Sequence, residues 1–183
     1  FNAMPPTPFV GSRWRESWVE RLEKTPPFGE QWLEHQRRDG FWKHGSVCED
    51  WSSIKCPVLA VGGFADGYTN AIPRLVEGLS SCFVRGLIGP WVHEFPEVAT
   101  PSPAIGFSQL CFKWWDRWLN GKQNGIDDIP KLTAWGHEFV QPRGSYQQRP
   151  GSWASEKEWP SKTPPFRLFA NLGGKLSTGN YDT

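Results

Sequence analysis

The fold is decided by residues 56–96, which read CPVLAVGGFADGYTNAIPRLVEGLSSCFVRGLIGPWVHEFP. Pro57–Val61 and Phe83–Ile88 are two short apolar runs, each followed by glycine. Continuous apolar runs of this length indicate strands that are buried on both faces, as in a parallel sheet. Between the two runs, helical spacing places four aliphatic side chains on one face: Ile72, Leu75, Val76 and Leu79. The stretch therefore predicts a strand, a helix and a second strand parallel to the first.

Two side chains that can carry chemistry follow these strands. Asp66 comes shortly after the first strand, and His93 comes shortly after the second, 27 residues further on. A β-α-β unit brings the carboxyl ends of both strands to one edge of the sheet, where open α/β sheets hold their active sites. Asp followed by His is also the order of the last two members of the Ser-Asp-His triad in α/β-hydrolases. We expect the Asp66 carboxylate to lie within hydrogen-bond reach of a His93 ring nitrogen, roughly 2.6–3.2 Å.

The segments around both residues resemble a known family. GGFADGY (62–68) and IGPWVHEFP (88–96) are similar to the Asp and His segments of the X-Pro dipeptidyl-peptidase and cocaine esterase family of serine hydrolases. The similarity extends to WLEHQRRDGFWKHGS (32–46) and FKWWDRWLNGKQNGI (112–126), and more loosely to WASEKEWP (153–160). The resemblance implies an α/β-hydrolase with a helical cap, followed by a jelly-roll β-sandwich. It also implies that Asp66 and His93 are catalytic.

The nucleophile of this family lies in a G-x-S-Y-x-G turn well upstream of the Asp and His segments. This sequence contains no G-x-S-x-G motif, and the nearest string, Gly106–Leu110, lacks the closing glycine. The first residue is Phe1, and the last residues fall inside a strand-like pattern. We therefore expect the chain to be the C-terminal half of a hydrolase, with its serine and oxyanion donors outside the chain.

Three domain segments are expected along the sequence. Residues 1–50, with helical spacing of Trp14, Trp18 and Leu22, are assigned to the end of the helical cap. Residues 51–122 are assigned to the C-terminal part of the hydrolase core, ending with an amphipathic helix. Gly121–Pro130, rich in glycine and polar residues, indicates a linker. Beyond it the periodicity becomes strand-like, and residues 131–183 are assigned to the start of the jelly-roll sandwich.

Composition excludes several other classes. A formal net charge of +1 without a basic run argues against a nucleic-acid surface. No apolar stretch approaches the roughly 20 residues that span a membrane. The four cysteines, Cys48, Cys56, Cys82 and Cys111, show no C-x-x-C spacing, so no zinc or other cofactor is expected. The last three lie in apolar contexts and are interpreted as buried free thiols.

Twelve tryptophans leave an alternative open. They are typical either of a core or of a non-catalytic, tryptophan-rich binding module whose rings stack on sugars. On the helix at 107–120, Trp114, Trp115 and Trp118 recur at helical spacing with other apolar residues, which favours the core. A third interpretation is a non-catalytic α/β domain in which Asp66 and His93 meet by chance.

The resemblance also implies a mechanism and a partner. His93 would act as general base toward the serine and then as general acid, while Asp66 holds the imidazole in one tautomer. Trp91 and Tyr68 flank the pair in sequence, and we expect them either to pack or to contact substrate. The expected partner is a small-molecule ester or peptide substrate. The sequence leaves open ester against amide, the acyl group, the oligomeric state and the cellular compartment.

Overall fold

The computed structural model describes residues 7–171 and 174–178. The chain divides into two compact units, Phe1–Glu49 and Asp50–Thr183. The division falls next to the boundary that the sequence predicts between the cap segment and the core segment.

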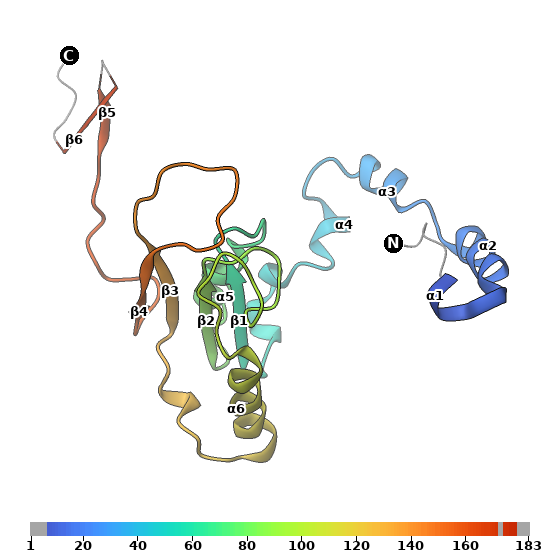
Figure 1. The fold of residues 1–183 in the computed structure, drawn as a ribbon, viewed down its shortest axis with the longest axis horizontal. Helices are drawn as coiled ribbons and strands as arrows, with labels where there is room; N and C mark the ends of the chain where they lie inside the picture. The colour runs from blue at the N-terminus through green and yellow to red at the C-terminus, as the bar shows by residue number, and fades with distance from the viewer. Residues whose placement is uncertain (1–6, 172–173, 179–183) are drawn as a thin grey trace. The chain divides into compact units, whose positions relative to one another are not determined.

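The first unit is helical (Figure 1). Its elements are α1 (Thr7–Val10), η1 (Gly11–Arg13), α2 (Trp14–Lys24), α3 (Phe28–Glu34), α4 (Gly40–Lys43) and η2 (Val47–Glu49). Asp39 caps α4, because its side chain accepts a hydrogen bond of 3.0 Å from the backbone N–H of Phe41. No described side chain of this unit is buried. Trp32 and Leu33 of α3 are exposed.

The second unit contains a four-stranded sheet (Figure 1). Its elements are η3 (Trp51–Ser53), β1 (Val58–Gly63), α5 (Ala71–Gly78), β2 (Val84–Gly89), α6 (Phe107–Asn120), η4 (Ile126–Asp128), β3 (Leu132–His137), β4 (Gly151–Glu156), β5 (Phe169–Asn171) and β6 (Lys175–Ser177). The strand order is β1-β2-β3-β4, with two parallel pairings and an antiparallel β4 at the edge. The predicted strand, helix and parallel strand at 56–96 are confirmed.

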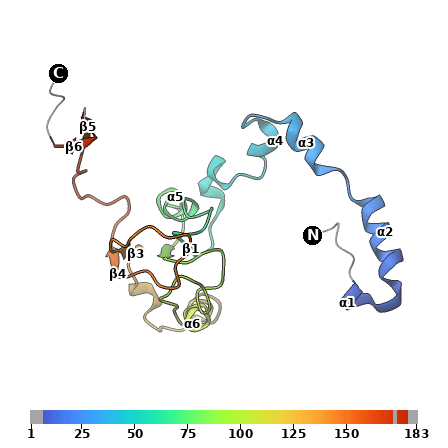
Figure 2. The same cartoon turned by 45° about the horizontal axis from the view of Figure 1, so that its top comes forward.

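Figure 2 shows α5 and α6 on opposite sides of β1. The α5 face forms the core, with buried Ala60, Ile72, Val76, Leu79, Val84, Ile88 and Leu132. Gly86 allows this packing, because a Cβ atom there would lie 2.6 Å from Val76 and 2.7 Å from Leu132. On the other face, Trp114 and Trp118 of α6 lie with their ring centroids 5.9 and 4.9 Å from that of Phe83.

The expected burial of α6 is only partly correct. Trp114 is buried, while Trp115 and Leu119 are exposed. The helix rests on the sheet along a narrow line through Trp114 and Trp118, so the outer part of its apolar surface has no cover within the described residues. The spacing of apolar residues predicted the helix correctly but overestimated the width of its buried face.

The first part of the segment assigned to a jelly roll, residues 131–183, joins the four-stranded sheet. Three register pairs, beginning with Gly86 and Leu132, join β3 to β2 in parallel, and β4 pairs with β3. Leu132 is buried in the core, and the Trp159 ring N–H donates a hydrogen bond of 3.2 Å to the Pro73 carbonyl. β3 and β4 therefore belong to this sheet, and Trp159 packs against its core. Within the described residues, β5 and β6 form a separate two-stranded sheet, and a jelly roll stays a prediction.

Candidate active site

Asp66 lies in a tight turn directly after β1. Its backbone N–H donates to the Gly63 carbonyl at 3.1 Å, which closes the turn. One carboxylate oxygen accepts a hydrogen bond of 2.8 Å from the backbone N–H of Tyr68, two residues on. This local bond is typical of aspartate in turns, and it fixes the direction of the carboxylate. The second oxygen is left free to meet another group.

His93 lies in a loop that folds back after β2. The backbone N–H of Val92 donates to the Thr100 carbonyl at 2.7 Å. The buried side chain of Trp91 holds the start of this loop in place. It is 1% exposed, and its ring N–H donates a hydrogen bond of 2.8 Å to the Pro103 carbonyl. Farther along, Glu97 accepts a hydrogen bond of 2.5 Å from the backbone N–H of Ser108 at the start of α6. The loop is thus fixed at several points on either side of the histidine.

The two loops are joined directly to each other. Gly63 and Gly89 are register partners at the ends of β1 and β2, so both loops start at the same level of the sheet. The N–H of Ala65 donates to the Trp91 carbonyl at 3.0 Å. This approach requires glycine at position 63, because a Cβ atom there would lie 2.0 Å from the Trp91 carbonyl oxygen. The glycine therefore sets the distance between the loops of Asp66 and His93.

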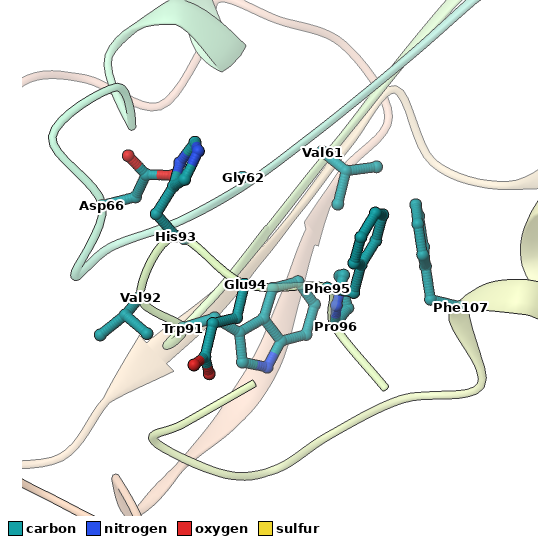
Figure 3. Close-up of a pocket in the computed structure, with 11 residues that line it drawn as sticks. Val61, Gly62, Asp66, Trp91, Val92, His93, Glu94, Phe95, Pro96 and Phe107 are labelled. Carbon is teal, nitrogen blue, oxygen red and sulfur yellow. The ribbon is translucent and has the colours of Figure 1, made fainter. Parts of the chain in front are cut away.

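The predicted contact between Asp66 and His93 is confirmed. Nδ1 of His93 lies 2.8 Å from Oδ2 of Asp66, across 27 residues of sequence (Figure 3). The Asp66 side chain is 12% exposed and the His93 side chain is 80% exposed, so the imidazole projects from the edge of the sheet. The catalytic role of both residues stays a prediction.

The electrostatics of the pair fix the tautomer of the histidine. The Tyr68 backbone N–H and, next, the hydrogen bond from His93 lower the pKa of Asp66, against a smaller opposing effect of burial. At neutral pH the carboxylate is therefore ionised and can only accept. In the neutral imidazole, Nδ1 of His93 is then the protonated ring nitrogen, and Nε2 carries the lone pair. An imidazole held in this way can take a proton from a hydroxyl group.

A pocket of about 350 Å³ lies beside the pair. It is lined by Val61, Gly62, Gly63, Asp66, Trp91, Val92, His93, Glu94, Phe95, Pro96 and Phe107. Figure 3 shows the Asp66–His93 pair at one end and the rings of Phe95 and Phe107 side by side at the other. The ring centroids of those two residues are 6.4 Å apart. The pocket therefore combines a polar end that can do acid–base chemistry with an apolar end.

The two predicted substrate-contact residues differ in position. Trp91 lies under the pocket and is almost completely buried, so the structure gives it a packing role and leaves little surface for a ligand. Tyr68 is 74% exposed, and its ring lies edge-on to the His93 ring with centroids 5.8 Å apart. A substrate contact by Tyr68 stays a prediction.

Sequence reasoning missed Phe95 and Phe107 as pocket residues. Phe95 is two residues from His93, but nothing in its local pattern distinguishes a pocket aromatic from a loop aromatic. Phe107 begins α6 and meets Phe95 only because the loop between them folds back, with the Ile105 N–H donating to the Pro96 carbonyl at 3.0 Å. That contact depends on the tertiary structure, so no local sequence pattern predicts it.

The first unit contains a second contact between histidine and aspartate. Nδ1 of His35 lies 2.6 Å from Oδ2 of Asp39, four residues away in sequence. Asp39 is also the N-cap of α4, and the His35 ring stacks on Phe41 with centroids 4.4 Å apart. This contact is a local feature of a helix start. The Asp66–His93 contact differs because two parallel strands bring together residues that are distant in sequence.

Arg38 forms an ion pair with Glu49 near the end of the first unit. Within residues 7–171 and 174–178, no cluster of three or more potential metal ligands is found. In the same part of the chain, no helix is both long enough and apolar enough to cross a membrane. The four exposed tryptophans, Trp32, Trp42, Trp115 and Trp153, lie on four different elements.

Comparison with known proteins points to one family. The family model of the X-Pro dipeptidyl-peptidases (S15 family) matches residues 7–94. A Bacillus cereus protein named "Putative Xaa-Pro dipeptidyl-peptidase" is 27% identical over 142 residues, which are 76% of this chain and 23% of that protein.

Solved structures show the same fold. A CocE/NonD family hydrolase from Staphylococcus aureus matches 91% of this chain and 28% of its own, with a TM-score of 0.62 and 14% identity. An aminopeptidase from a marine sediment Thaumarchaeota archaeon matches 88% of this chain and 27% of its own, with a TM-score of 0.59 and 19% identity. The chain thus spans about a quarter of the length of these relatives.

Proposed function

We propose that this chain, whose residues 7–94 match the family model of the X-Pro dipeptidyl-peptidases (S15 family), is part of a serine hydrolase that cleaves peptide or ester bonds. In this proposal Asp66 and His93 are two members of the catalytic triad. The serine lies outside this chain, since the sequence has no G-x-S-x-G motif.

The observation that carries the proposal is the contact of 2.8 Å between His93 Nδ1 and Asp66 Oδ2. It lies at the carboxyl edge of two parallel strands, where α/β enzymes place their reactive groups. The exposed Nε2 of His93 is the atom that would take the proton of the serine hydroxyl. The same nitrogen would then donate that proton to the leaving group. Asp66 stays ionised throughout and stabilises the imidazolium that forms between these two steps.

The pocket beside the pair supports a substrate with an apolar part. Phe95 and Phe107 offer ring surface at the end away from His93. In this proposal Tyr68, whose exposed ring lies beside His93, contacts the reacting group of the substrate. The choice between an amide and an ester substrate depends on groups that this chain does not contain. The proposal therefore includes both.

The proposal is tested in the complete enzyme that contains this chain, by labelling with a fluorophosphonate probe. This reagent reacts only with a serine that an adjacent base activates. We expect one serine to be labelled, and we expect His93→Gln to reduce the labelling rate by at least a hundredfold. His44→Gln, at an exposed histidine of the first unit, is the matched control and should leave the rate unchanged. Equal labelling of the His93→Gln enzyme would contradict the proposal.

The substrate class follows from a second assay on the same enzyme. A panel of X-Pro amides and amino-acid esters distinguishes a dipeptidyl-peptidase from an esterase by the ratio of their kcat/KM values. A preference of a hundredfold or more for either group assigns the class. Turnover of neither group by an enzyme that takes the serine label would restrict the proposal to another acyl substrate.

A further inference from the structure

Two cysteines lie side by side at the edge of the sheet opposite to the Asp66–His93 pair. Cys56 comes two residues before Val58 of β1, and Cys82 comes two residues before Val84 of β2. Val58 and Val84 are register partners in the parallel pairing. Extending this register by two residues places Cys56 opposite Cys82. Both cysteines hold free thiols in the structure.

Hydrogen bonds hold the two backbone segments together on both sides of the cysteines. After the cysteines, the Val58 N–H donates to the Phe83 carbonyl at 2.8 Å. Before them, the Ser81 hydroxyl donates to the Ile54 carbonyl at 3.0 Å. The spacing between Cys56 and Cys82 is therefore fixed from both directions, as it is for neighbours within a sheet.

This spacing suits a disulfide bond. Neighbouring strands lie roughly 4.8 Å apart, and disulfides join residues whose Cα atoms are roughly 4.4–6.8 Å apart. Side chains two positions apart on a strand point to the same face. Val58 and Val84 both face the core beneath α5, and Cys82 packs against that core as well. Cys56 lies in a bend just before β1, close enough to Cys82 to act on its thiol.

The two thiols differ in environment, which suggests different roles. Cys56 is exposed and can meet a reagent from solvent, while Cys82 is half-buried. Burial, and next the nearby Cys56, raise the pKa of the Cys82 thiol, against a smaller opposing effect of Lys55. Cys82 is thus protonated at neutral pH, and its partial burial keeps it from attacking a reagent in solvent. Cys56 is suited to react first, with Cys82 as the second thiol.

We propose that Cys56 and Cys82 form a redox-responsive pair, which a low-molecular-weight disulfide converts into a disulfide between β1 and β2. The Cys56 thiolate attacks one sulfur of the reagent RSSR, forms a mixed disulfide and releases RS⁻. Cys82 then loses its proton to solvent and attacks the Cys56 sulfur, which releases the second RS⁻. The protein loses two electrons and two protons, and RSSR is reduced to two RSH. The new bond would join the starts of the two strands whose other ends carry Asp66 and His93.

Peptide mapping under non-reducing conditions tests this proposal on the 183-residue chain. The chain is incubated with glutathione disulfide, its remaining thiols are alkylated, and it is digested with trypsin. Cleavage after Lys55, Arg74 and Arg85 separates peptide 56–74, which contains Cys56, from peptide 75–85, which contains Cys82. We expect these two peptides to be joined, with a mass two hydrogens below their sum, and to separate after reduction. The Cys48→Ser/Cys111→Ser double variant keeps the pair and should give the same joined peptide.

Several results would overturn the proposal. One is recovery of peptides 56–74 and 75–85 as separate alkylated species after oxidation. Another is a stable glutathione adduct on each cysteine without a bond between them. A third is a bond from either cysteine to Cys48 or Cys111 in the wild-type chain. The Cys48→Ser/Cys111→Ser variant keeps the test valid, because it removes competing thiols without changing the residues at the sheet.

Discussion

Replacing Gly63 with alanine should destabilise the second unit and separate the loops of Asp66 and His93. The new Cβ atom would lie 2.0 Å from the Trp91 carbonyl oxygen and 2.6 Å from its carbonyl carbon. Neither atom belongs to a flexible side chain, so the backbone itself must move by about 1 Å or more to reach ordinary contact distance. The Trp91 carbonyl oxygen also accepts the hydrogen bond from the Ala65 N–H that joins the two loops.

The size of the effect follows from these two losses. Overpacking of a well-packed site costs about 1–3 kcal/mol, and loss of the hydrogen bond adds about 0.5–1.5 kcal/mol. We therefore expect Gly63→Ala to lower the free energy of unfolding by about 2–4 kcal/mol. Gly67→Ala is the matched control, because Gly67 lies in the same turn and no atom is found within 4 Å of its ideal Cβ position.

Urea unfolding followed by tryptophan fluorescence measures both variants. The midpoint for Gly63→Ala should fall well below that of the wild-type chain, while Gly67→Ala should change the free energy of unfolding by less than about 0.5 kcal/mol. Equal midpoints for the two variants would refute the reasoning. They would mean that the Trp91 carbonyl can move aside at no cost and that Gly63 does not fix the loops.

Three further predictions concern stability, pH and activity. Leu79→Ala, at a side chain that is 1% exposed, should cost about 2–4 kcal/mol of unfolding free energy, while Leu119→Ala, at 78% exposure, should cost less than about 0.5 kcal/mol in the same urea assay. Because the folded-state pKa of Asp66 is depressed, its contribution to stability is present above the unfolded pKa near 3.9 and is lost as the pH falls through the folded pKa. The urea midpoint of the wild-type chain should therefore fall as the pH is lowered through this range, and the midpoint of Asp66→Asn should fall less steeply. Identical dependence of the two midpoints on pH would contradict the depressed pKa of Asp66. Finally, this chain alone should take no fluorophosphonate label, since the triad acts as a unit, and a stoichiometric label would contradict a serine outside the chain.

The parts of the fold that depend on local pattern could be predicted from the sequence. The apolar runs before Gly62 and Gly89 indicated two buried strands, and the aliphatic spacing between them indicated α5. The contact between Asp66 and His93 followed from the rule that parallel strands end at one edge. Each of these inferences needed only residues that are close in sequence and one topological rule.

The parts that depend on distant contacts could not be predicted in the same way. The segment Gly121–Pro130 has the composition of a domain linker, but its length and polarity do not show whether the next strand joins the same sheet. In the structure the next strand does join the same sheet, and long-range hydrogen bonds hold the segment before it, such as that from the Arg85 side chain to the Ile129 carbonyl at 2.7 Å. The exposure of Trp115 and Cys56 was missed for the same reason, since an apolar neighbourhood in sequence does not ensure cover in space.

The proposed role of Asp66 as the partner of a catalytic His93 is tested most directly by the kcat of Asp66→Asn in the complete enzyme. Asparagine keeps the shape of the side chain but favours the wrong tautomer of His93, so we expect kcat to fall by about 10³–10⁴-fold. Asp39→Asn changes the other aspartate that contacts a histidine, and we expect its kcat to stay within about threefold of the wild-type value. A loss of less than tenfold for Asp66→Asn, or an equal loss for Asp39→Asn, would contradict the central claim.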